Sequence, residues 1–172
     1  MSESVAVSAV RVAVVQFDPQ VGIHNIQSNL QNSLDLAREA AMNGADLIVL
    51  PELANTGYLF ANRQDAFDHA ETVPDGPSVK AWINFAQKHQ VYLVAGLAEQ
   101  DAMQLFDTAV LLGPDGFVGK YRKAHLWNKE KLWFTPGNLG FPVFETSIGR
   151  IGLLICWDIW FPEVPRLLSQ QG

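Results

Sequence analysis

The sequence predicts an α/β fold in a single domain. Its opening third alternates an apolar β-branched run, a helical period and a second apolar run, the pattern of two strands joined by a helix. Further along, a Gly-Pro-Asp-Gly turn separates two more strand-like segments, as in a β-hairpin. With 172 residues, of which 48% are hydrophobic and 17% charged, the chain is long enough to bury one sizeable core.

The first three elements follow from local periodicity. Residues 11–17, RVAVVQF, are predicted to form a buried strand. A helix is expected over residues 25–43, because apolar side chains recur at three- and four-residue spacing, and Gly44 is suited to cap its C-terminus. Residues 46–50 form a second short strand, which Pro51 ends. Two strands with a helix between them favour parallel pairing and a right-handed crossover.

The middle of the chain alternates loop, helix and strands. Residues 52–77 lack a clear period and are expected to form a long loop with at most one helical turn. Ser78 is placed to cap a helix that runs to about Gln90, and a strand over residues 91–96 follows. Residues 107–112 and 117–121 then flank the turn and predict an antiparallel hairpin.

The C-terminal third leads to the only cysteine. Residues 122–140 are expected to be another loop, before a strand near residues 143–144. The apolar run 151–155 predicts a strand buried on both faces that delivers Cys156 to a strand-to-helix turn, with a helix over residues 162–171. Helix-entry N–H groups at such a turn would lower the pKa of the thiol and offer donors to an oxyanion.

Composition excludes several classes of function. The net charge of −6 and the absence of a Lys or Arg run argue against nucleic-acid partners. One cysteine forms no internal disulfide, and the four histidines have no metal-ligand spacing, so neither a metal nor another cofactor is expected. Residues 1–10 resemble no signal peptide. They predict a flexible N-terminus on a cytoplasmic protein that binds a small molecule and no membrane.

Three polar side chains stand just after predicted strands: Glu52, Lys123 and Cys156. Residues that leave neighbouring strands can converge at one edge of an α/β sheet. A carboxylate can take the proton of a thiol, and an ammonium can stabilise the oxyanion that forms when sulfur attacks an amide or nitrile carbon. Each residue also has a structural interpretation: a solvated loop acid, one of a surface basic trio, and a small core cysteine.

Longer motifs surround these three residues. The segments PELANTGYLF, GKYRKAHLWNKEKLWFTPG and RIGLLICWDIWFPEVPR, with the GPDG hairpin, closely resemble the motif regions of the nitrilase superfamily, the carbon–nitrogen hydrolases, in the right order. The resemblance implies a four-layer α-β-β-α sandwich over residues 11–172. It also implies that the sandwich is incomplete at its C-terminus, because members of the family continue beyond the helix after the cysteine.

The resemblance implies a role for each site residue. Glu52 would be the general base, Lys123 the stabiliser of the tetrahedral intermediate, and Cys156 the nucleophile that becomes a thioester. Glu130 matches a further glutamate that positions substrate and nucleophile.

Two more residues are expected at the pocket, and a third is expected to have no catalytic role. The backbone N–H of Trp157 would complete the oxyanion hole. Tyr58 would line the pocket, although a core aromatic remains an alternative. His125 is expected to be structural rather than catalytic, because its KAHLW setting matches the lysine motif.

The predicted function is a cofactor-free hydrolase of a non-peptide C–N bond in a small linear amide. Two alternatives stay open: a nitrilase or N-carbamoyl amino acid hydrolase, and a non-catalytic truncated assembly module. The resemblance also implies a homodimer or larger assembly, with the helix after Cys156 near the interface. Residues 157–168 carry more large apolar side chains than a short turn needs, which supports this expectation. Packing of the same side chains under a missing C-terminal half stays open as an alternative.

Overall fold

The computed structural model describes residues 9–172, so most of the N-terminus predicted to be flexible, residues 1–10, lies outside the described residues. The strands are β1 (Val12–Val14), β2 (Leu47–Val49), β3 (Tyr92–Asp101), β4 (Gln104–Gly113), β5 (Gly116–Arg122), β6 (Val143–Thr146) and β7 (Gly149–Gly152). The α-helices are α1 (Ile26–Met42), α2 (Arg63–His69), α3 (Pro77–His89) and α4 (Glu163–Gln170). Three 3₁₀ helices accompany them: η1 (Ile23–Asn25), η2 (Asn128–Leu132) and η3 (Cys156–Trp160).

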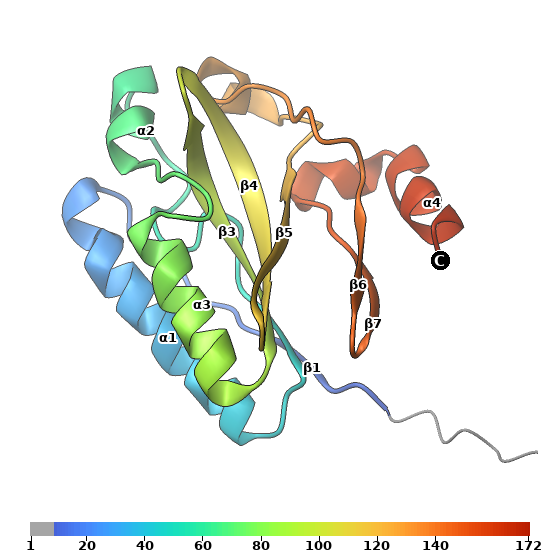
Figure 1. Cartoon of the computed structure of the whole chain (residues 1–172). Coiled ribbons are helices and arrows are strands. Elements are labelled where there is room, and N and C mark those ends of the chain that lie inside the picture. Colours follow the sequence, from blue (N-terminus) through green and yellow to red (C-terminus); the bar gives the residue numbers. More distant parts are fainter. Residues whose placement is uncertain (1–8) are drawn as a thin grey trace, which may run out of the picture.

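The main sheet has five strands in the order β1-β2-β3-β4-β5 (Figure 1). The first three strands are parallel, and β3, β4 and β5 are joined as antiparallel neighbours. The predicted parallel pair and the predicted hairpin at the Gly-Pro-Asp-Gly turn are therefore both confirmed. Because β3, β4 and β5 alternate in direction, β5 runs the same way as β2, and both strands end at the same edge of the sheet.

Helices α1 and α3 cover one face of this sheet (Figure 1). Alternate strand residues such as Ile48, Leu93 and Val110 point to this face and are fully buried. Trp82 of α3 packs there too, and its indole N–H donates a hydrogen bond of 3.0 Å to the buried Ser33 hydroxyl of α1. The apolar stripe of each helix thus packs on the face of the sheet that every second strand residue forms.

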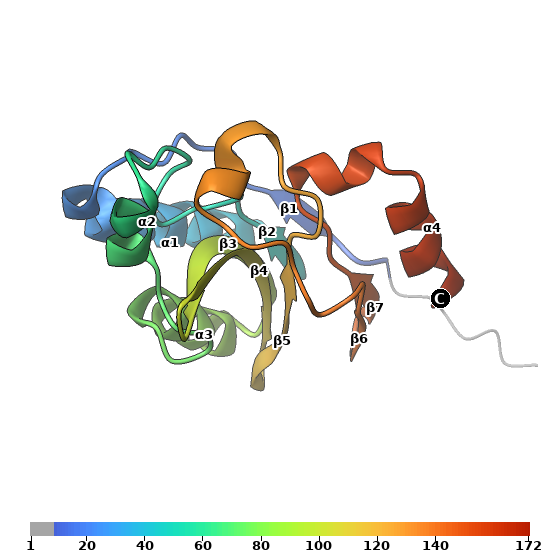
Figure 2. The same ribbon diagram turned by 90° about the horizontal axis from the view of Figure 1, so that it is seen from above.

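The β6–β7 hairpin covers the other face, and α4 lies beyond it, as the view from above shows (Figure 2). Phe144 of β6 packs against Gly119 of β5, where a Cβ atom would stand 2.2 Å from the Phe144 ring. Leu111, Tyr121, Leu153 and other buried residues fill the space between the two β-layers. The elements therefore follow the order helix, sheet, hairpin, helix, in agreement with the predicted α-β-β-α arrangement.

The prediction of a doubly buried strand over residues 151–155 was wrong. Strand β7 ends at Gly152 and, in the part of the chain that the structure describes, pairs only with β6, in a separate two-stranded sheet. Leu153 and Ile155 are buried, but they lie in an irregular segment that leads into η3. Their apolar character comes from packing against the main sheet rather than from membership of it.

Strand β1 also differs from its prediction. Ala13 and Val15 pack on the helix-covered face, but Val12 and Val14 are 52% and 70% exposed. β1 is shorter than expected, has β2 as its only neighbour within residues 9–172, and carries these valines on the opposite face. A run of apolar residues is compatible with a buried strand. The position of the strand in the sheet decides whether both of its faces are covered.

Two further expectations about the middle of the chain need correction. The region 52–77 contains all of α2, whose start is capped by the Asn62 side chain accepting a hydrogen bond of 3.0 Å from the Asp65 N–H. Helix α3 begins after Gly76 with Pro77 in its first turn, so Ser78 is not its cap. Ser78 instead donates from its N–H and its hydroxyl to the Glu71 carboxylate, at 2.8 and 2.6 Å.

Among the described residues, none of the helices combines the length and the apolar character that crossing a bilayer requires.

Candidate active site

Glu52 and Lys123 meet at the edge of the sheet where β2 and β5 end. Glu52 follows β2 after two residues, and Lys123 comes directly after β5. The Lys123 ammonium donates a hydrogen bond of 2.6 Å to the Glu52 carboxylate, across 71 positions of sequence. The structure thus brings together two of the residues that the motifs single out.

Among residues 9–172, Lys123 is the cation that lies at the centre of a group of three carboxyl groups. Its Nζ atom also donates to Glu130 Oε1 at 2.7 Å and lies 3.6 Å from Asp107 Oδ2. The lysine side chain is fully buried, so these charges interact with little screening by solvent. Glu52 is the one carboxyl group of the three that keeps some solvent exposure, at 18% of its side chain.

Glu130, in η2, is held by three donors. Besides Lys123, the Tyr58 hydroxyl and the backbone N–H of Trp127 donate to its carboxyl oxygens, the latter at 2.7 Å. Burial raises the pKa of Glu130 to about 7, opposed by the Trp127 N–H and increased further by repulsion from Glu52 and Asp158. Tyr58 therefore contacts the site residue Glu130 directly, and it is 37% exposed rather than a core aromatic.

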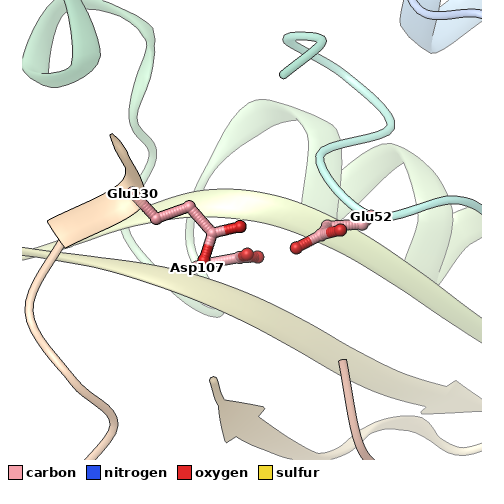
Figure 3. Close-up of side chains that lie close together, drawn as sticks. All are labelled: Glu52, Asp107 and Glu130. Atoms are coloured by element: carbon pink, nitrogen blue, oxygen red, sulfur yellow. The ribbon is translucent and has the colours of Figure 1, made fainter. Parts of the chain in front are cut away.

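Asp107 on β4 is a third carboxyl group of this site, and the sequence analysis missed it. One of its carboxyl oxygens lies within 4.8 Å of one oxygen of Glu52 and one of Glu130, which are equally close to each other (Figure 3). Burial raises the pKa of Asp107 well above its ordinary value, and the neighbouring Glu52 adds to the effect while Lys123 opposes it. The signal in the sequence was a lone acid inside an otherwise apolar strand, LFDTAVLL.

Cys156 is the first residue of η3, with a φ of +43°. This left-handed conformation is rare for residues other than glycine, asparagine and aspartate, and such strain concentrates at functional sites. The residue is exposed and lines a pocket of about 110 Å³ together with Glu52. The thiol and the proposed base therefore face the same small space.

The expectation of a lowered thiol pKa was wrong. Burial of the sulfur raises the pKa of Cys156, and the negative charge of Glu52 raises it further, while Lys123 acts in the opposite direction. Burial and the nearby carboxylates thus outweigh the attraction of the Lys123 ammonium. The raised pKa favours the protonated thiol form of Cys156.

Asp158 fixes the turn that carries Cys156, and the sequence did not reveal its role. This fully buried carboxylate accepts hydrogen bonds from the N–H of Ile155 at 3.1 Å and from the Tyr121 hydroxyl at 2.8 Å. It also accepts the backbone N–H of His125 at 3.0 Å and lies 2.7 Å from the His125 Nδ1 atom. His125 stacks on Phe161 with ring centroids 3.8 Å apart, a packed position that suits the structural role expected for it.

The loop that carries Glu52 packs on a glycine of the neighbouring strand. A Cβ atom on Gly96 of β3 would lie within 2.8 Å of backbone atoms of Pro51, Glu52 and Leu53. Two hydrogen bonds tie the same contact, from Ala54 N–H to the Gly96 carbonyl at 2.8 Å and from Gly96 N–H to the Pro51 carbonyl at 3.2 Å. Only glycine allows the backbone of this loop to approach β3 so closely.

Aromatic side chains line a second pocket beside Glu130. A pocket of about 220 Å³ adjoins Glu130 and is lined by Tyr58, Leu59, Trp127, Asn128, Lys129 and Trp133. Trp157 follows the nucleophile, and its ring neighbours those of Trp127 and Trp160, with centroids 6.3 and 5.7 Å away. These walls suit a small ligand with an apolar part and one polar group.

The three carboxyl groups have the spacing of a cation site, and a side-chain cation lies among them. The Lys123 ammonium is within 2.7 Å of Glu52 and Glu130 and 3.6 Å from Asp107. It supplies the positive charge that a metal ion would otherwise bring to these ligands.

Comparison with known proteins matches the chain to one family. The family model described as "Carbon-nitrogen hydrolase" matches residues 11–172. A nitrilase from Pyrococcus abyssi is 44% identical over 163 residues, which cover 95% of this chain and 62% of the relative. A citrullinase from Francisella tularensis is 36% identical over 170 residues, covering 95% of this chain and 58% of the relative.

Solved structures share the fold. The crystal structure of a carbon-nitrogen hydrolase from Helicobacter pylori G27 superposes with a TM-score of 0.85 at 31% sequence identity, covering 95% of this chain and 56% of the other. The chain therefore spans about three fifths of the length of the relatives that it matches.

Proposed function

The chain belongs to the carbon-nitrogen hydrolase family, and we propose that the protein hydrolyses the C–N bond of a small linear amide through a thioester on Cys156. The observation that carries this proposal is the arrangement around Lys123, which binds Glu52 and Glu130 at 2.6 and 2.7 Å while Glu52 shares a pocket with Cys156. A base, a cation and a thiol are the groups that acyl transfer to sulfur requires.

In the first half of the proposed reaction, Glu52 takes the proton of the Cys156 thiol as sulfur attacks the carbonyl carbon. The raised pKa of the thiol makes this base necessary. The ammonium of Lys123 and the backbone N–H of Trp157 stabilise the oxyanion of the tetrahedral intermediate. Glu52 then returns the proton to the departing nitrogen, the C–N bond breaks, and the acyl group remains on sulfur as a thioester.

In the second half, water replaces the nitrogen. Glu52 takes a proton from a water molecule as the water oxygen attacks the thioester carbon, and Lys123 again stabilises the oxyanion. The C–S bond then breaks, the carboxylic acid leaves, and the proton held by Glu52 returns to the sulfur. Glu130 holds the Lys123 ammonium and the Tyr58 hydroxyl in place throughout both halves.

A nitrilase reaction is the second candidate, and the relative from Pyrococcus abyssi, named as a nitrilase and 44% identical, favours it. The same groups suffice, because a nitrile and a carbamoyl group also present an electrophilic carbon to sulfur. Product analysis separates the reactions. Ammonia with a carboxylic acid from a nitrile supports nitrilase activity, whereas carbon dioxide release supports a carbamoyl hydrolase.

The test is ammonia release from a panel of small amides by the full-length protein and its Cys156→Ala and Cys156→Ser variants. We expect both substitutions to abolish turnover, and mass spectrometry of the quenched wild-type protein to find an acyl group on the Cys156 peptide. Ser169→Ala, on the exposed side of α4, is the matched control and should leave turnover unchanged.

Two results would count against this function. Ammonia release that is unaltered in both cysteine variants, with folding verified by circular dichroism, would exclude the thioester. A folded wild-type protein that acts on no amide, nitrile or carbamoyl compound would favour a non-catalytic assembly module.

A further inference from the structure

We propose that Asp107 serves as a neutral carboxylic acid that donates a hydrogen bond to Glu52, so that it positions the general base. This inference rests on the proposed function, because it gives Asp107 the role of holding Glu52, the proposed general base. Asp107 is a positioning residue: it acts through Glu52 rather than on the substrate. In Figure 3 its carboxyl group lies between those of Glu52 and Glu130.

The first argument is the lack of donors around Asp107. The residue is 1% exposed, and neither of its carboxyl oxygens accepts a hydrogen bond from any of the described residues. An ionised carboxylate buried without donors is strongly disfavoured, and such a group takes up a proton instead. A protonated acid is better matched to this position, because it needs an acceptor, and the Glu52 carboxylate is one.

The second argument is the charge balance of the cluster. Three carboxyl groups face one ammonium, and Lys123 makes hydrogen bonds to Glu52 and Glu130 but stands 3.6 Å from Asp107, too far for one. The next cation along β5, Arg122, donates to Glu99 and Asp101 instead. A proton on Asp107 thus removes a negative charge that no side chain in the cluster balances.

The other titratable groups that face Asp107 do not change this balance. Tyr121 of β5 lies near enough to feel its charge, but the Tyr121 hydroxyl donates to Asp158 at 2.8 Å. Burial and the charge of Glu52 raise the pKa of Asp107 well above its ordinary value, although Lys123 opposes them, and this direction agrees with the protonated form.

A neutral Asp107 has a consequence for catalysis. It leaves the negative charge of the base on Glu52, which shares the pocket with Cys156 and takes the thiol proton. A second carboxylate at this place would oppose both the thiolate and the oxyanion that form during the reaction. Its hydrogen bond also restricts the rotation of the Glu52 carboxyl group and so keeps the base aimed at the sulfur.

The protonation state is tested directly by infrared spectroscopy of full-length protein labelled with ¹³C at the aspartate carboxyl groups. At neutral pH we expect the isotope-shifted C=O stretch of a protonated carboxylic acid. It should be absent from Asp107→Asn and retained in Asp115→Asn, the matched control in the exposed hairpin turn. The aspartate label separates this band from any protonated glutamate, Glu130 included. Absence of the band from the wild-type protein would overturn the proposal.

The positioning role is tested by kinetics of Asp107→Asn and Asp107→Leu. Asparagine keeps an uncharged donor of the same shape, so kcat should fall less than about fivefold, whereas leucine removes the donor and should lower kcat by about tenfold or more with little change in KM. Equal losses in the two folded variants would refute the positioning role. The infrared band needs no turnover, so a failure of the proposed amide reaction would be recognised separately.

Discussion

At the scale of single residues, the site shares one ammonium among three carboxyl groups whose surroundings differ. Glu52 keeps partial contact with solvent, Glu130 receives three donors, and Asp107 receives none. Like charges this close cannot all be ionised at once, so burial and hydrogen bonding separate their protonation states. The surroundings of each carboxyl group, rather than its residue type, thus determine whether it carries a proton.

Glu130 makes the stability of the protein depend on pH. Its folded-state pKa of about 7 lies above the ordinary value of 4.5, so the folded state keeps a proton that the unfolded state has lost between these values. The contribution of Glu130 to stability is therefore fully present below pH 4.5 and is lost as the pH rises through about 7.

We predict that urea unfolding of the wild-type protein and the Glu130→Gln variant will show how the contribution of Glu130 to stability falls as the pH rises. The difference in unfolding free energy, wild type minus variant, should fall by about 3 kcal/mol between about pH 4 and about pH 8, at ~1.36 kcal/mol for each unit of pKa shift. Glu145→Gln, at an exposed position of β6, should give a difference that hardly changes. A difference for Glu130→Gln that is constant with pH would contradict the prediction.

At the scale of elements, the site depends on two loops and a turn held against the ends of strands. Asp158 ties η3 to Tyr121 at the end of β5, and Gly96 lets the Glu52 loop lie on β3. The contact at Gly96 is made by backbone atoms, which cannot move aside as a flexible side chain can. Small changes at the supporting positions should therefore displace Glu52 and Cys156.

We predict that Gly96→Ala will lower kcat on the order of tenfold to a hundredfold, because the new methyl group pushes the backbone of Glu52 away from β3. It should also cost about 1–3 kcal/mol of stability through overpacking. Steady-state kinetics and urea unfolding measure the two effects.

Gly119→Ala is the matched control for that variant. It too adds a methyl group to a buried strand of the same sheet, but this group meets the Phe144 ring on the hairpin side. It should destabilise the fold by a similar amount while kcat per folded molecule stays near the wild-type value. Equal losses of kcat in the two variants would show that the Glu52 loop is not specifically sensitive to Gly96.

At the scale of the whole molecule, large apolar side chains lie exposed on the segment after Cys156. Trp160 is 72% exposed, Ile159 59% and Leu167 43%. Such a group, with aromatic residues at its centre, is typical of a protein interface. We propose that the full-length protein is a homodimer or larger assembly with η3 and α4 near the contact.

This assembly predicts that Trp160→Lys will weaken the dimer at least tenfold in its dissociation constant, as expected for the loss of an aromatic anchor. Light scattering over a dilution series measures the change, and circular dichroism verifies that the monomer stays folded. Met103→Lys, equally exposed at the β3–β4 turn, should leave the assembly unchanged. A wild-type protein that is monodisperse and monomeric at micromolar concentration would refute the proposal.

The sequence by itself determined the order and type of most elements, along with the identity of the family. Helices α1 and α3, the β4–β5 hairpin and the parallel pairing of β1 with β2 all followed from local periods and turn residues. These signals are local, because the spacing of apolar residues reflects which side of one element faces a core. The motifs likewise singled out Glu52, Lys123 and Glu130, which the fold brings into contact.

The tertiary structure alone decided what depends on distant neighbours. It placed β7 outside the main sheet, left Val12 and Val14 exposed, and reversed the expected direction of the Cys156 pKa shift. It also brought Asp107 and Asp158 to the site. Burial and charge are properties of an environment assembled from segments far apart in the chain, so no local pattern records them. In the sequence, Asp107 is only a lone acid within a mostly apolar strand. Its part in the site becomes clear once the structure places the Lys123 ammonium beside it.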